Sequence, residues 1–301
     1  MKQIFMNNGS LRNGWWILGF AALIVASQPL YRFLKGWMTE LGATEPVLEL
    51  ISPMLIVLIT FICLKFRREP LSSVGLKFNR KWLKHFSIGT LLGGAAIALT
   101  AGLIVLIGGV SFSLNAEANV NLLAYGLYLF LIGSFLEELL HRGFIFQRLI
   151  DGIGEWPAQL LIASLFAFGH WGNPGMEGST MLISSLDLFL GSLILGLAYI
   201  RTKSLALPIG LHLGWNWFQG NVLGFGVSGH EKTGVLLPEF HGLPQWLTGG
   251  DFGPEASVIS LVVSCFALVY IWVWPGSQSQ LDDEALILDN TKKSTPLTIA
   301  S

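Results

Sequence analysis

Residues 120–143 read VNLLAYGLYLFLIGSFLEELLHRG, and this stretch decides the fold class. No charged residue occurs in it before Glu137, and an uncharged apolar run of this length is typical of a helix that crosses a membrane. Four polar residues then follow within six positions: Glu137, Glu138, His141 and Arg142. The stretch therefore predicts a membrane-spanning helix that carries ionisable groups at its end.

The rest of the chain has the same apolar character. Of its 301 residues, 52% are hydrophobic and only 12% are charged, and the mean hydropathy is +0.60. An ordinary soluble domain carries roughly a quarter of charged residues, so a water-soluble globule is excluded. Similar apolar runs occur at residues 15–33, 46–64, 86–110, 120–140, 156–171, 181–200, 205–224 and 255–274. We expect an all-α, polytopic membrane protein of about eight transmembrane helices.

The basic residues predict how these helices are oriented. Fifteen of the 18 Lys and Arg residues fall in segments that face one side of an eight-span chain, and only Arg32, Lys35 and Lys232 face the other. Because Lys and Arg accumulate on the cytoplasmic side, both termini are expected there, most simply in a bacterial plasma membrane. Residues 1–275 read as a single membrane domain in contact with the lipid bilayer, and residues 276–301 as a polar, disordered cytoplasmic tail. The net charge of −1 excludes nucleic acid as a partner.

Polar groups within the apolar runs are few, and they gather in three places. Ionisable residues inside a membrane cost several kcal/mol, so each is a candidate functional residue. Residues four apart share one helix face. The candidates with this spacing are Glu138 and Arg142, Glu137 and His141, and His212 and Asn216, and His170 stands alone at the end of the fifth run. Together they predict one polar cavity within the membrane.

The residue types indicate what such a cavity does. Glu138 and Arg142 can form a buried structural ion pair, but Glu137 has no cation at helical spacing except His141. A carboxylate in an apolar site suits a general base that deprotonates water. An imidazole can hold that water, and a second histidine with an amide can donate hydrogen bonds to an oxyanion.

A metal cofactor is left open by the same residues. Two histidines and one glutamate form a permitted catalytic zinc site, which Glu137, His170 and His212 would supply. The His-Glu-x-x-His helix of many metalloproteases is absent. We therefore expect either no cofactor or a divalent metal such as Zn²⁺.

Three motifs in this order resemble those of a known family. Glu137-Glu138-x-x-x-Arg142, Phe166-x-x-x-His170 and His212-x-x-x-Asn216 are similar to the motifs of the CPBP family, the CAAX prenyl endopeptidases and bacteriocin-processing or Abi-type membrane proteins. The motifs cover residues 137–216 within a resembling stretch of about 70–220.

The resemblance implies a glutamate-dependent intramembrane endopeptidase that acts on a hydrophobic or lipidated peptide or on a membrane protein. It implies that Glu137 is the base and that His170 holds the water, while His212 and Asn216 stabilise the oxyanion. Glu138 and Arg142 would support these groups.

Two other classes of function remain open. A non-catalytic membrane adaptor or immunity protein could keep the same fold and bind a partner through the cavity. A proton-coupled transporter would use Glu and His side chains to relay protons. Asp187 keeps this interpretation possible, because it has no basic residue within four positions to pair with. Asp187 either lines the cavity or is a hydrogen-bonded group between packed helices.

Overall fold

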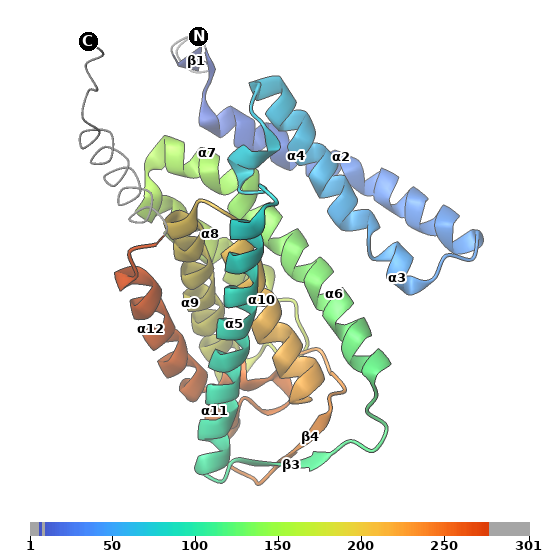
Figure 1. The fold of residues 1–301 in the computed structure, drawn as a ribbon, viewed down its shortest axis with the longest axis vertical. Helices are drawn as coiled ribbons and strands as arrows, with labels where there is room; N and C mark the ends of the chain where they lie inside the picture. The colour runs from blue at the N-terminus through green and yellow to red at the C-terminus, as the bar shows by residue number, and fades with distance from the viewer. Residues whose placement is uncertain (1–5, 8–9, 277–301) are drawn as a thin grey trace, which may run out of the picture.

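The computed structural model describes residues 6–7 and 10–276, so the predicted polar tail lies outside the described residues from position 277 onward. Figure 1 shows a bundle of long helices with one short two-stranded ribbon at its lower end. The elements in chain order are β1 Met6–Asn7, β2 Ser10–Leu11, α2 Asn13–Glu40, α3 Glu45–Leu48, α4 Ile51–Arg67, η1 Leu71–Val74, α5 Arg80–Leu106, β3 Val110–Leu114, α6 Val120–Glu138, η2 Leu139–Gly143, α7 Phe144–Ile153, α8 Glu155–Gly169, α9 Gly178–Thr202, α10 Ala206–Trp217, η3 Phe218–Val222, β4 Leu236–Phe240, α11 Gln245–Thr248, η4 Gly250–Phe252, η5 Pro254–Ala256 and α12 Val258–Val273.

Every one of the eight predicted runs contains a helix in the structure, which confirms the helical class. Within the described part of the chain, five helical segments are long and apolar enough to cross a membrane: 13–40, 45–67, 80–106, 120–153 and 178–202. Helices α8, α10 and α12 have 15, 12 and 16 residues, which is short for a hydrocarbon core of about 30 Å. The number of eight spans therefore stays a prediction.

The helices form two groups. Helix α10 packs against α5, α6 and α9, and α9 in turn packs against α8 and α12. Helix α2 packs against α4 and α7, and Figure 1 shows α2 and α4 beside this bundle. The start of α2 and the end of α12 lie at the end of the molecule opposite β3 and β4 (Figure 1). The candidate residues of α6, α8 and α10 thus all lie in the larger group of helices.

Glycines allow α5 and α10 to approach closely. A Cβ atom on Gly93 of α5 would lie 2.1 Å from the carbonyl oxygen of Leu211, and one on Gly214 of α10 would lie 2.0 Å from that of Thr90. Small residues four apart on facing helices permit such backbone contact in membranes. This contact fixes the height of α10, and therefore of His212 and Asn216, relative to α5.

The ribbon of β3 and β4 is a difference from the predicted all-α fold. The two five-residue strands pair antiparallel, with Val110 opposite Phe240 and Leu114 opposite Leu236. Residue 110 had been assigned to the end of a membrane-spanning run, because Val, Ile and Leu precede it without a charge. Periodicity cannot reveal this pairing, since the two strands are more than 120 residues apart and each is short.

Candidate active site

A cavity of about 950 Å³ lies among α5, α6, α8, α9, α10 and α12. Its lining is mostly apolar, with a few polar groups that converge from different helices, which is typical of a ligand or active site. The lining includes six of the predicted residues, namely Glu137, His141, Phe166, His170, His212 and Asn216. Three distant parts of the sequence therefore meet at one cavity, as the gathering of the few polar groups in three apolar runs predicted.

Glu138 and Arg142 lie behind the cavity wall and form the predicted pair. Arg142 Nη1 lies 3.1 Å from Glu138 Oε1, and neither side chain is exposed. Arg142 Nη2 also donates to the carbonyl oxygen of Ser192 at 3.0 Å and lies 2.5 Å from its Oγ. This network ties the end of α6 to the middle of α9.

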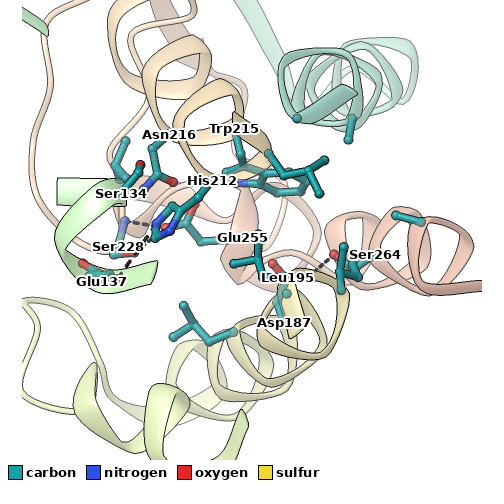
Figure 2. Close-up of a pocket in the computed structure, with 18 of the residues that line it drawn as sticks. Ser134, Glu137, Asp187, Leu195, His212, Trp215, Asn216, Ser228, Glu255 and Ser264 are labelled. Carbon is teal, nitrogen blue, oxygen red and sulfur yellow. Dashed lines mark hydrogen bonds and ion pairs between the residues drawn. The ribbon is translucent and has the colours of Figure 1, made fainter. Parts of the chain in front are cut away.

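His212 connects this buried pair to the cavity. Its Nδ1 lies 2.9 Å from Glu138 Oε1, and its Nε2 lies 3.9 Å from Glu137 Oε2. A carboxylate ion only accepts hydrogen bonds, so Nδ1 carries the proton and Nε2 faces Glu137. The 3.9 Å separation is longer than a hydrogen bond, and both atoms can contact a third group. Figure 2 shows His212 and Asn216 extending from α10 toward Ser134 and Glu137.

The chain changes its helical pitch between the two glutamates and the following helix. Leu139–Gly143 forms one π-helical turn, which contains His141 and Arg142. Such turns occur frequently at functional sites. His141 Nδ1 donates to the backbone carbonyl of Glu137 at 2.8 Å, not to its carboxylate as the i,i+4 spacing had indicated. The Glu137 side chain is consequently left for the cavity, where 37% of it is exposed.

Phe166 organises the imidazole rings around it. Its ring centroid lies 5.2 Å from that of His141, 4.7 Å from that of His170 and 6.2 Å from that of His212. The Arg142 guanidinium lies 5.1 Å from the same ring, within the range of a cation–π contact. His170 Nδ1 donates to the Phe166 carbonyl at 2.8 Å, which leaves its Nε2 as the free ring nitrogen.

Two further carboxylates line the cavity, and sequence reasoning had recognised only one of them. Asp187 accepts hydrogen bonds from Ser260 Oγ at 3.1 Å and Ser264 Oγ at 2.8 Å, so it both lines the cavity and joins α9 to α12. Glu255 is buried and accepts from Gln219 Nε2 and from the backbone and hydroxyl of Ser228. Figure 2 shows Asp187 beside Ser264, away from Glu137. The one signal for Glu255 is its position as the first residue of the last apolar run, 255–274.

The three candidate metal ligands are not assembled into a metal site. Among the residues that the structure describes, no group of three His, Cys, Asp or Glu side chains could hold a metal ion. Glu137 and His212 lie 3.9 Å apart. His170 and His212 each contact the ring of Phe166.

Comparison with known proteins agrees with the resemblance carried by the motifs. Residues 119–218 match the family model described as Type II CAAX prenyl endopeptidase Rce1-like. No curated protein matches the chain significantly. The matched segment begins at the cap of α6 and ends after α10, so it contains all three motifs.

Proposed function

Because residues 119–218 match the family model described as Type II CAAX prenyl endopeptidase Rce1-like, we propose that this protein is an intramembrane endopeptidase. It hydrolyses a peptide bond in a hydrophobic or lipidated peptide or in a membrane protein, by means of water that Glu137 activates. The observation that carries this proposal is the position of Glu137, which faces His212 Nε2 at 3.9 Å in a mostly apolar cavity.

The proposed reaction uses residues that line the cavity. Glu137 takes a proton from a water molecule that His170 holds, and the water oxygen attacks the carbonyl carbon of the substrate. Asn216 donates a hydrogen bond to the resulting oxyanion, and His212 assists it. When the C–N bond breaks, the proton on Glu137 passes to the leaving amine. No separate nucleophile is required.

Glu138 and Arg142 act as positioning residues in this mechanism. Glu138 holds the His212 ring through Nδ1, and Arg142 fixes Glu138 to α9 through Ser192. With Nδ1 engaged in this way, Nε2 donates to an oxyanion only when the ring is doubly protonated. The negative charge on Glu138 favours that imidazolium form, which gives the second glutamate a role distinct from that of Glu137.

The apolar part of the cavity supports a hydrophobic substrate. The lining continues to Leu99 of α5 and Phe266 of α12, whose side chains are 55% and 74% exposed on the outer surface of the bundle. In a bilayer, this surface would face the lipid chains, so an apolar substrate could enter between α5 and α12. We place the protein in the cell membrane, with both termini in the cytoplasm.

The proposal is tested with purified protein in a non-ionic detergent. The substrates are internally quenched peptides, one set with a prenylated cysteine three residues from the C-terminus and one set of unmodified hydrophobic peptides. Glu137→Ala, His170→Ala and the double variant should fall to a similar low rate, because residues that act as a unit are not additive. Glu117→Ala, an exposed glutamate before α6, is the matched control and should keep wild-type activity.

If the fold-loss of hydrolysis rate in the double variant equals the product of the two single losses, Glu137 and His170 do not act together. Binding of the peptides without any Glu137-dependent hydrolysis would instead support the adaptor reading.

A further inference from the structure

Ser134 carries a buried hydroxyl in the wall of the cavity that the proposed reaction leaves unused. It lies on α6 three residues before Glu137, lines the same cavity and is only 2% exposed. Its Oγ atom has no hydrogen-bond partner in the part of the chain that the structure describes. Buried polar atoms without a partner are rare, and a catalytic role is one of the reasons for which proteins keep them.

The backbone of α6 does not satisfy this hydroxyl. Serine and threonine side chains within a helix often donate to a carbonyl four residues earlier. Thr90, Thr100 and Ser164 do so in this protein, at 3.0, 3.1 and 2.9 Å. Because Ser134 makes no such bond, its hydroxyl is available to a group in the cavity.

One other atom of the cavity wall is in the same condition. Among the described residues that line the cavity, only Ser134 and Glu137 have a buried side-chain atom without a hydrogen-bond partner, namely Oγ and Oε2. The two residues are three positions apart, so they share one face of α6. The unused hydroxyl thus lies directly beside the proposed base.

The direction of the helices places Ser134 level with Asn216. Helix α6 begins after β3, and α10 leads through η3 toward β4, which pairs with β3. The start of α6 and the end of α10 therefore lie at the same end of the bundle, and the two helices run antiparallel (Figure 1).

The two pairs of residues on these helices consequently match. Ser134 precedes Glu137 by about 4.5 Å along its helix axis, and Asn216 follows His212 by about 6 Å, at 1.5 Å per residue. As Glu137 faces His212, the antiparallel direction brings Ser134 opposite Asn216. Figure 2 shows the Asn216 side chain extending toward Ser134.

We propose that Ser134 is a further catalytic residue, whose hydroxyl donates a hydrogen bond to the oxyanion together with the Asn216 amide. The proposal rests on the proposed function, which supplies that oxyanion. His212 Nε2 can donate only when the ring is doubly protonated, whereas a hydroxyl and an amide donate in their neutral forms. Two neutral donors from facing helices then stabilise a charge that develops only in the transition state.

The first test compares single-turnover hydrolysis in a non-ionic detergent. Ser134→Ala should slow the reaction by about 10²-fold with nearly unchanged peptide binding, because the hydrogen bond strengthens only as the oxyanion forms. Ser184→Ala on α9 is the matched control. The Ser184 hydroxyl is also buried without a partner in the described part of the chain, but it does not line the cavity, so this variant should keep the wild-type rate.

A peptide phosphinate provides a second readout, because its negatively charged tetrahedral group mimics the oxyanion. Ser134→Ala should weaken phosphinate binding by about the same factor as the rate, while the affinity for the uncleaved peptide stays nearly constant. Equal weakening of both ligands would indicate a structural defect and would overturn the catalytic role.

Three other results would also overturn it. One is an unchanged rate in Ser134→Ala. Another is an acid limb of the pH–rate profile that moves to higher pH in this variant, which would indicate a hydrogen bond to the Glu137 carboxylate instead. The third is a substrate acyl fragment found on Ser134 by mass spectrometry, which would identify a nucleophile. Failure of the proposed function has a different signature, namely the absence of Glu137-dependent hydrolysis in the wild-type protein.

Discussion

The same substitution is expected to lower the stability of the protein at Glu138 and to leave it almost unchanged at Glu137. Glu138 is completely buried, accepts a hydrogen bond from His212 and neutralises Arg142, which is itself completely buried. Glu138→Gln keeps the shape of the side chain but leaves the guanidinium without a counter-ion. Removing one partner of a buried ion pair costs about 3–5 kcal/mol of folding free energy.

Glu137 lies in a different environment. Its side chain is 37% exposed, and its nearest charged contact is His212 Nε2 at 3.9 Å. Pairs that are exposed to this degree contribute about 0–1 kcal/mol to stability. Glu137→Gln should therefore unfold close to the wild-type temperature, although it loses hydrolysis almost completely.

Thermal unfolding of the two variants in detergent, followed by intrinsic tryptophan fluorescence, measures this difference directly. We expect a clear fall in the midpoint for Glu138→Gln and almost none for Glu137→Gln. A Glu138→Gln protein as stable as the wild type would contradict the buried ion pair. Equal destabilisation of both variants would contradict the assignment of Glu137 to the cavity and Glu138 to the wall behind it.

Three other perturbations test the fold, the packing and the role of His212. Reporter fusions after Arg67 should read cytoplasmic and fusions near Gly242 external, and a cytoplasmic signal at Gly242 would refute the eight-span topology. Gly214→Ala should lower the unfolding temperature, because its Cβ would meet the α5 backbone, whereas Gly102→Ala, with open space around it, should not. His212→Ala should slow single turnover by about 10²- to 10³-fold with nearly unchanged peptide binding, as expected for an oxyanion donor. Stoichiometric zinc in the wild type that is missing from this variant would indicate a metal ligand instead.

The sequence predicts the parts of this protein that depend on local spacing. Each of the eight apolar runs contains a helix of the structure, although α7 lies outside all of them. The four-residue interval between Glu138 and Arg142 predicts their ion pair. The scarcity of polar groups within the runs also indicates that Glu137, His170 and His212 share one cavity, because isolated ionisable groups would be too costly.

The remaining features depend on contacts between distant segments or on backbone geometry. His141 lies in the π-helical turn Leu139–Gly143 and donates to the Glu137 carbonyl, and the spacing of side chains does not indicate a backbone partner. The bond from His212 to Glu138 depends on the height of α10 relative to α6. Glu255 enters the cavity through a loop and a short 3₁₀ turn, for which hydrophobic periodicity gives no signal.

The location of the cavity mouth has a consequence for when a substrate meets this protein. Besides the apolar opening between α5 and α12, the cavity reaches the surface at His230, which is exposed and lies in the segment between η3 and β4. The segment leads into β4, which lies at the end of the bundle opposite the start of α2 (Figure 1). If the fusions place Gly242 outside the cell, a peptide reaches Glu137 only after it has been exported or inserted into the membrane. Newly made chains in the cytoplasm would then be protected from cleavage by the bilayer itself, and processing would be a late step in the maturation of the substrate.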